Sequence, residues 1–267
     1  MSEELEGKHG VQSLEVGMGI LKAMVGGKRS MMLKDIAAAA EMPPSKAHRY
    51  LVSLIRAGLV EQDPLTSRYN LGPFALNIGL VAIDRLDRVR LGMAAIAELR
   101  DSINETTALA VWGDNGPVVV RWERPRRAIT VNVVTGTTLG LLSSAAGRVF
   151  AAGLPRSQVE PLLLMELAGS NLPPGIRSLD DANALLADVA ARGIAAISGD
   201  YVVRGVEAVA TPVFNFKNEL TMALIIVGVE GSIDMGPASP VIAELKKASQ
   251  ALSLRLGSTR SLEVPAQ

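Results

Sequence analysis

The chain of 267 residues is long enough for one large domain or two ordinary ones, and a composition of 48% hydrophobic and 20% charged residues excludes intrinsic disorder. Lysine and arginine together number 27, as do aspartate and glutamate, so the chain is not uniformly basic, although a local basic face remains open. With no cysteine and two histidines, disulfides, thiolate zinc sites and histidine-rich metal centres are excluded, and we expect no metal and no cofactor.

Two features of the sequence bear on location. The first six residues are acidic and polar, unlike the basic start and apolar run of a signal peptide. The most apolar stretch, 220–229, is about half as long as a membrane-spanning helix. We therefore interpret it as a buried strand and expect a soluble, cytoplasmic protein without membrane contact.

Two helices are predicted before residue 43. The first covers 13–25, where apolar residues recur every three or four positions, and Ser13 is its expected N-cap. A glycine-rich loop at 26–30 ends this helix. The second helix is shorter and ends before the pair Pro43-Pro44.

The third predicted helix has two chemically different faces. It begins at Pro43 or Pro44, because proline favours the first turn of a helix, and it ends at Gly58. One face is apolar, and the opposite face carries bases and hydroxyls without a carboxylate, namely Ser45, Lys46, Arg49, Ser53 and Arg56. Such a face suits a polyanion, but a solvated helix surface has the same appearance.

The segments that follow decide between these readings. Two short apolar segments around Asp63-Pro64 predict a β-hairpin. Three helices followed by a hairpin form a winged helix-turn-helix, in which the third helix enters the major groove and the hairpin is the wing. An unrelated three-helix bundle is the alternative.

From Pro73 to Asn104 the pattern is helical, with a charged stretch in the middle. It predicts a long helix, bent near the charges, that joins two domains and pairs subunits. The alternative is an amphipathic core helix of the second domain.

Beyond Thr106, strands and helices alternate. Gly113-Asp114-Asn115-Gly116 between two apolar runs predicts a hairpin. Further strands are expected at 129–134, 194–197, 206–214 and 220–229, and helices from Ser143 to Gly153, from Ser178 to Gly193 and from Pro240 to Leu256. A hairpin-rich sheet surrounded by helices is an α+β fold and not a doubly wound one.

No catalytic constellation is present. Gly26-Gly27-Lys28-Arg29 lacks the leading glycine and the hydroxyl of a phosphate-binding loop. Ser143 and Ser144 have no histidine in the second half of the chain, which excludes a Ser-His triad there. We therefore do not expect an enzyme.

Several segments resemble the IclR family of bacterial transcriptional regulators. In chain order they are Ser13-Leu14 with Ile20-Leu21, Pro44 to Leu51, Ala57 to Glu61, Arg68 to Gly72, Ser144 to Arg148, Arg192 to Ala195 and Gly205 to Phe214. The resemblance covers nearly the whole chain in the right order. It implies a winged helix-turn-helix over 1–73, a linker helix over 74–90 and a GAF-like effector-binding and oligomerisation domain over 91–260. It also implies a homodimer, or a dimer of dimers, on a palindromic operator in double-stranded DNA.

The sequence departs from this family in two places. Glu41 and Met42 occupy the turn before the recognition helix, where many relatives have glycine, and a left-handed Glu41 would cost about 1–2 kcal/mol. The positions that match polar ligand-binding side chains of some relatives are Ser198, Ala208 and Ile225, of which only the first is polar. We therefore expect an aromatic or otherwise apolar organic acid as effector.

On DNA, Arg49 is the best candidate for a bidentate base contact, and Lys46 and Ser45 read bases or phosphates. Ser53 and Arg56 are expected at the backbone. Arg68 on the wing would touch phosphate or the minor groove, and His48, at the edge of the helix face, packs or contacts DNA.

The effector site is expected between the sheet and the helix that begins near Ala145. The backbone N–H groups of Ala145 and Ala146 would hold a carboxylate, because a helix N-terminus supplies free donors. The full set is Leu139, Ser144, Ala145, Ala146, Ser198, Ala208, Ala210 and Ile225. The apolar members could instead be ordinary core. Two other functions remain open, namely a small-molecule-binding enzyme and a DNA-binding protein that is insensitive to ligand.

Overall fold

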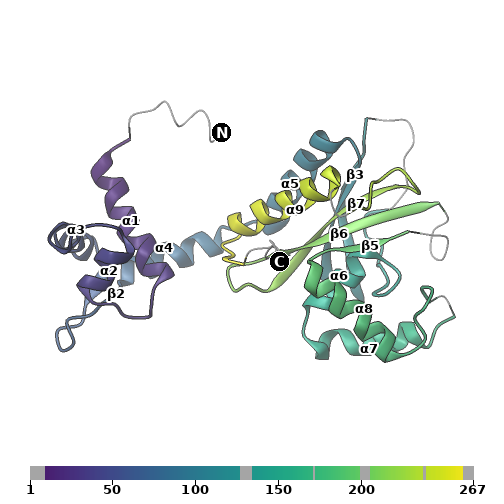
Figure 1. Cartoon of the computed structure of the whole chain (residues 1–267), viewed down its shortest axis with the longest axis horizontal. Helices are drawn as coiled ribbons and strands as arrows, with labels where there is room; N and C mark the ends of the chain where they lie inside the picture. Colours follow the sequence, from purple (N-terminus) through teal and green to yellow (C-terminus); the bar gives the residue numbers. More distant parts are fainter. Residues whose placement is uncertain (1–9, 127–133, 171, 199–204, 237–238, 261–267) are drawn as a thin grey trace. The chain divides into compact units, whose positions relative to one another are not determined.

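The computed structural model describes residues 10–126, 134–170, 172–198, 205–236 and 239–260 (Figure 1). The chain forms two compact units, Met1–Leu86 and Asp87–Gln267. The helices and strands of the first unit are α1 (Gln12–Gly26), α2 (Leu33–Ala39), α3 (Pro44–Arg56), β1 (Val60–Gln62), β2 (Tyr69–Leu71) and α4 (Pro73–Asp84). Those of the second are α5 (Arg88–Ile103), β3 (Thr106–Gly113), β4 (Gly116–Glu123), α6 (Ala145–Gly153), α7 (Arg156–Leu167), α8 (Leu179–Arg192), β5 (Ala195–Ile197), β6 (Val206–Phe214), β7 (Leu220–Val229) and α9 (Pro240–Arg255).

The first unit is a winged helix-turn-helix, as predicted. Its core forms where α1, α2 and α3 meet, and Ile20, Ile36 and Leu51 are fully buried there. β1 and β2 pair antiparallel to form the wing. Met31 extends this pairing, because its N–H donates to the Tyr69 carbonyl at 3.1 Å and its carbonyl accepts from the Tyr69 N–H at 2.8 Å. The wing is therefore tied to the segment between α1 and α2.

The second unit is built on a five-stranded antiparallel sheet in the order β4-β3-β7-β6-β5. The hairpin at Asp114-Asn115 joins β3 to β4, as predicted. Helices α5 and α9 pack together and contact the sheet, and α6 covers the other face (Figure 1). Strands β6 and β7 are buried along almost their whole length. The α+β prediction is confirmed.

Helix ends in the second unit follow their local signals. The Ser144 hydroxyl accepts from the Gly147 N–H at 2.8 Å and caps α6. Ser178 and Asp181 form a reciprocal capping box at the start of α8. Gly193 ends α8 with a φ of 64°, a left-handed conformation that glycine adopts without strain.

Two local predictions are wrong. Helix α1 begins at Gln12, because the Val11 carbonyl accepts the first hydrogen bonds of the helix, and Ser13 therefore lies inside the first turn and does not cap it. The predicted long helix is two helices. The Asp87 carboxylate accepts from the Arg90 N–H at 2.9 Å and starts α5 as a new helix after α4 has ended.

One helix of the second unit was not predicted, and one predicted strand lies outside the described residues. Helix α7 was not predicted, because its apolar residues do not keep to one face and Pro161 lies inside it. The strand expected at 129–134 falls almost entirely on 127–133, outside the described residues.

We predict that Glu41→Gly stabilises the first unit. Glu41 is exposed and has a φ of 50° in the turn between α2 and α3, a conformation that costs a residue with a Cβ atom about 1–2 kcal/mol. Glycine removes this strain, although its larger unfolded-state entropy offsets part of the gain. The free energy of unfolding, measured by urea denaturation, should rise by about 0.5–1 kcal/mol.

Lys34→Gly is the matched control, because Lys34 is exposed inside α2. That change should lower the free energy of unfolding by about 1 kcal/mol. Equal destabilisation at both positions would contradict the strain at Glu41.

Candidate nucleic-acid interface and effector site

The basic face predicted on α3 is exposed along its whole length. Leu51, Leu54 and Ala47 are buried on the opposite face. The exposed residues are Ser45, Lys46, His48, Arg49, Ser53 and Arg56. His48 therefore lies on the exposed surface and does not pack into the core.

The cations on this face are available to a ligand. Within the described part of the chain, Lys46, Arg49 and Arg56 form no ion pair, and the first turn of α3 contains no acidic residue. The Ser53 hydroxyl donates to the Arg49 carbonyl at 3.4 Å, so it is already engaged by its own helix. The first unit thus presents an uncompensated basic helix although the whole chain has no net charge.

The wing is ordered by one carboxylate at its tip. Asp63 Oδ1 accepts from the Leu65 N–H at 2.8 Å and from the Thr66 N–H at 3.3 Å. The Leu65 N–H, followed by contacts from Thr66, lowers the pKa of Asp63 below its ordinary value. Arg68 Nη1 donates to the Ser30 carbonyl at 3.3 Å, so Arg68 is exposed but anchored beside the wing.

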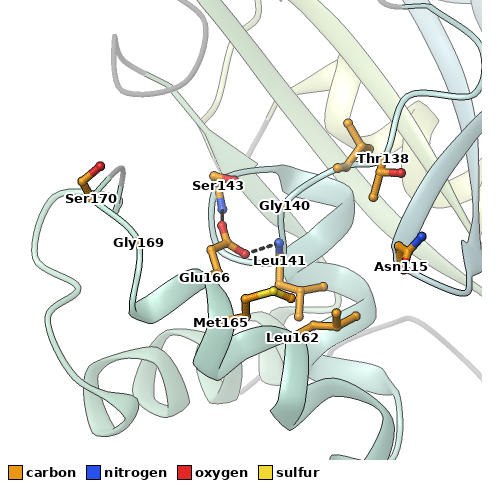
Figure 2. Close-up of a pocket in the computed structure, with 11 residues that line it drawn as sticks. Asn115, Thr138, Gly140, Leu141, Ser143, Leu162, Met165, Glu166, Gly169 and Ser170 are labelled. Atoms are coloured by element: carbon orange, nitrogen blue, oxygen red, sulfur yellow. Dashed lines mark hydrogen bonds between the residues drawn. The ribbon is translucent and has the colours of Figure 1, made fainter.

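In the second unit, the segment before α6 is held by a carboxylate that the sequence analysis missed. Glu166 of α7 accepts hydrogen bonds from three consecutive N–H groups, those of Leu141, Leu142 and Ser143. Figure 2 shows the bonds from Leu141 and Ser143. Glu166, Leu141 and Ser143 line a cavity of about 440 Å³ with Leu139, one of the predicted effector residues. No sequence pattern links Glu166 to a loop more than twenty positions away.

The first turn of α6 lies against this segment. The Ser144 hydroxyl donates to the Gly140 carbonyl at 2.8 Å while it caps the helix. A Cβ atom on Gly147 would lie 1.9 Å from the Gly140 carbonyl oxygen, so only glycine permits this approach.

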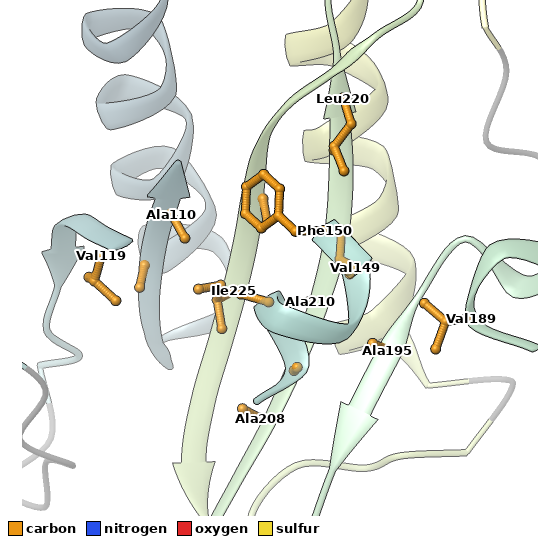
Figure 3. Packing of buried hydrophobic residues seen from close by; sticks show 14 of the residues in the cluster. Ala110, Val119, Val149, Phe150, Val189, Ala195, Ala208, Ala210, Leu220 and Ile225 are labelled. Carbon is orange, nitrogen blue, oxygen red and sulfur yellow. The ribbon is translucent and has the colours of Figure 1, made fainter. Parts of the chain in front are cut away.

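Five of the eight predicted effector residues lie together in the buried cluster between α6 and the sheet (Figure 3). They are Ala145, Ala146, Ala208, Ala210 and Ile225. Leu139 packs against the same cluster. Across the sheet, Ile225 pairs with Ala108 on one side and with Ala210 on the other, so one large side chain stands between two small ones.

Two buried N–H groups at the start of α6 have no hydrogen-bond partner among the described residues. Ala145 and Ala146 are each about 1% exposed. Among the described residues, neither backbone N–H donates a hydrogen bond, because the Ser144 cap serves Gly147. Buried N–H groups without partners are rare, and at a helix N-terminus they suit an anion.

Ser198 is not brought to this cluster. It is exposed just after β5, and its hydroxyl donates to Glu230 Oε1 at 3.5 Å. The described residues contain no group of three or more histidine, cysteine, aspartate or glutamate side chains placed to hold a metal ion. Across the same part of the chain, every helix is too short or too polar to cross a membrane.

An exposed basic helix on a winged helix-turn-helix, followed in the same chain by an α+β unit, defines a DNA-binding transcriptional regulator. The chain matches the IclR helix-turn-helix domain over residues 13–64 and the bacterial transcriptional regulator IclR C-terminal domain over residues 81–254. The chain therefore belongs to the IclR family, whose members are transcriptional regulators and not enzymes.

Individual relatives agree with this assignment. The chain is 29% identical to the glycerol operon regulatory protein of Streptomyces griseus, over 94% of this chain and 98% of that one. The crystal structure of HmgR from Pseudomonas aeruginosa is 39% identical, covers 94% of this chain and 100% of its own, and has a TM-score of 0.85. An IclR homolog from Microbacterium hydrocarbonoxydans, crystallised with 4-hydroxybenzoate, is 20% identical over 91% of this chain and 98% of its own, with a TM-score of 0.52.

We predict that Arg49→Ala weakens specific DNA binding without unfolding the first unit, because Arg49 is exposed and has no ion-pair partner among the described residues. Loss of a bidentate base contact should cost about 1–3 kcal/mol and relax base preference at one position of the site. Fluorescence anisotropy on a DNA site that the wild-type chain selects from a random library measures both effects.

Arg56→Ala is the control, because Arg56 lies in the last turn of the same helix. As a phosphate contact it should weaken binding to all sequences alike and reduce the slope of log affinity against log salt by about 1. If Arg49→Ala leaves affinity and base preference unchanged, Arg49 does not read bases.

Proposed function

We propose that this protein is a sequence-specific regulator whose binding to a palindromic operator is modulated by a small organic acid, aromatic or otherwise apolar, held in its second unit. The observation that carries the effector half is the pair of buried N–H groups at Ala145 and Ala146, which donate no hydrogen bond within the described residues. The exposed basic face of α3 carries the DNA half. Because the target is chromosomal DNA, the site of action is the cytoplasm.

The side chains around the start of α6 favour an apolar acid. The carboxylate would accept from Ala145 and Ala146 at the positive end of α6. The body of the ligand would lie against Ala208, Ala210 and Ile225, which offer methyl and methylene groups and no polar partner. A ring that buries on the order of 150 Å² of apolar surface would contribute about 4 kcal/mol. A small polar acid gains much less from such walls.

A known complex has the same ligand chemistry. The Microbacterium hydrocarbonoxydans homolog was crystallised with 4-hydroxybenzoate, an aromatic carboxylate. At 20% identity the homolog shares the fold of this chain. Its ligand supports testing aromatic acids on this chain but does not identify the effector.

The domain boundaries stay a proposal, with DNA binding over 1–73, a linker over 74–90 and effector binding over 91–260. Helix α4, within the linker, presents an apolar surface that its own unit does not bury. The exposed side chains include Phe74, Leu76, Ile78, Leu80 and Val81. A surface of this kind in a small unit marks a protein interface. We assign a second copy of the chain to it, because a palindromic operator requires two recognition helices related by a twofold axis.

We expect aromatic acids to bind and small polar acids to bind weakly or not at all. The test is calorimetry on the full chain with benzoate, protocatechuate, glyoxylate and pyruvate side by side. Ala145→Pro removes one proposed donor at a helix position that favours proline, and the extended backbone of Ser144 is compatible with a following proline. This variant should lose benzoate affinity by about tenfold or more.

The circular dichroism and the DNA affinity of Ala145→Pro should match the wild type, because the first unit has its own core. Tight binding of glyoxylate and pyruvate with no binding of the aromatic acids would contradict the proposed effector class. Operator binding unaffected by every acid would favour a ligand-insensitive DNA-binding protein.

The double variant Leu76→Glu/Leu80→Glu should convert the dimer to monomers and weaken operator binding. Leu76 and Leu80 are 62% and 55% exposed and lie one turn apart on α4, so the changes leave the core of the unit intact. Sedimentation velocity measures the oligomer, and anisotropy measures the DNA affinity.

Asn77→Glu adds a negative charge at an exposed polar position of the same helix and should leave the dimer unchanged. A double variant that sediments like the wild type would show that α4 does not form the interface.

A further inference from the structure

We infer that Glu166 is a positioning residue for the effector site. It holds residues 140–143, and through them the first turn of α6, so that the N–H groups of Ala145 and Ala146 stay aimed at an organic acid that Glu166 does not touch. The identity of the ligand as an organic acid rests on the proposed function. The role of Glu166 in fixing the geometry of the two N–H groups does not depend on it.

Both carboxylate oxygens of Glu166 accept hydrogen bonds from the backbone of this segment. One carboxylate oxygen accepts from the Leu141 N–H at 2.6 Å and from the Leu142 N–H at 3.1 Å, and the other accepts from the Ser143 N–H at 3.1 Å. Hydrogen bonds to an ionised acceptor are about twice as strong as those between neutral groups. The three donors therefore orient three successive peptide units immediately before α6.

The other polar groups of this segment transmit that constraint to the helix. The Gly140 carbonyl accepts from the Ser144 hydroxyl, and the same hydroxyl accepts from the Gly147 N–H. Arg148 Nε donates to the Leu142 carbonyl at 2.7 Å, and its Nη1 donates to the Ala196 carbonyl at 2.9 Å. A displacement of residues 140–143 would therefore displace the start of α6 as well.

The side chains of the segment are fixed independently of its backbone. Leu141 and Leu142 are buried in a smaller core with Val159 and Leu163 of α7 and Leu186 of α8. The segment thus stays near α7 when the carboxylate is lost, but the directions of its peptide units are no longer specified. A substitution at Glu166 should consequently alter local geometry more than global stability.

The negative charge of Glu166 and its positioning role predict opposite changes in the affinity for an acid when Glu166 is replaced. A negative charge near an anion site weakens anion binding, so removal of the charge alone would raise the affinity for an acid. Removal of the positioning contacts would lower it. The sign of the change in affinity therefore separates the two roles.

The test compares Glu166→Gln with Glu160→Gln in the full chain. Glu160 lies on the same helix, is 39% exposed and pairs with Arg156, so this control removes the same charge without touching the segment. In the absence of any acid, Glu166→Gln should raise the hydrogen-exchange rates of amides 141–143 and 147, which are hydrogen-bonded in this segment, by about tenfold or more. Its affinity for benzoate should fall by about tenfold, and its DNA affinity without acid should equal that of the wild type.

Glu166→Asp provides a second variant that keeps the charge but withdraws the carboxylate by one methylene group. It should show intermediate exchange rates and an intermediate benzoate affinity. Unchanged exchange at 141–143 and 147, a rise in benzoate affinity in Glu166→Gln, or equal effects in Glu160→Gln would each overturn the inference. If no acid binds the wild type, the proposed function fails, and the exchange rates alone decide the role of Glu166.

Discussion

The second unit depends on the burial of β6 and β7 on both faces. Because side chains alternate along a strand, each strand has to satisfy two different neighbours. Toward α6 the residues are small, as at Ala208 and Ala210, and the helix start comes close to the sheet. Toward α9 the carbonyl of Pro212 accepts from the Ser249 hydroxyl at 2.5 Å. The candidate effector site depends on these small residues, because they allow the N-terminus of α6 to lie close to the apolar face of the sheet.

The first unit solves a different physical problem, which is to concentrate positive potential in a chain without net charge. The hydrophobic core of α1, α2 and α3 places every cation of α3 on the surface, and the first turn of α3 contains no acidic residue. A field of this kind acts over about 10 Å at ordinary ionic strength, so it is felt at the DNA backbone and not beyond. Global charge therefore says little about what this surface binds.

The elements that could be predicted from the sequence are those specified by nearby residues. The amphipathic α3, the Asp114-Asn115 hairpin and the Ser178 cap each depend on side chains within one or two turns. The errors have local causes as well, since the Val11 carbonyl starts α1 and Asp87 starts a new helix where a bend was expected. Glu166 could not be predicted, because its partners lie 23 to 25 positions away and carry no polar side-chain pattern. Of the effector set, Ala208 and Ile225 were chosen by the resemblance to relatives and lie in the cluster beside α6, whereas Ser198, chosen in the same way, is exposed outside it.

The close approach of Gly147 to the Gly140 carbonyl has a consequence for inheritance. Every amino acid other than glycine has a Cβ atom. Every missense mutation at codon 147 therefore places an atom in contact with the Gly140 carbonyl oxygen at a distance that is too short. The winged helix-turn-helix has its own core, so we expect it to stay folded in such a variant. On the proposed function, one nucleotide substitution at codon 147 would produce an allele that still occupies its operator but no longer responds to metabolites.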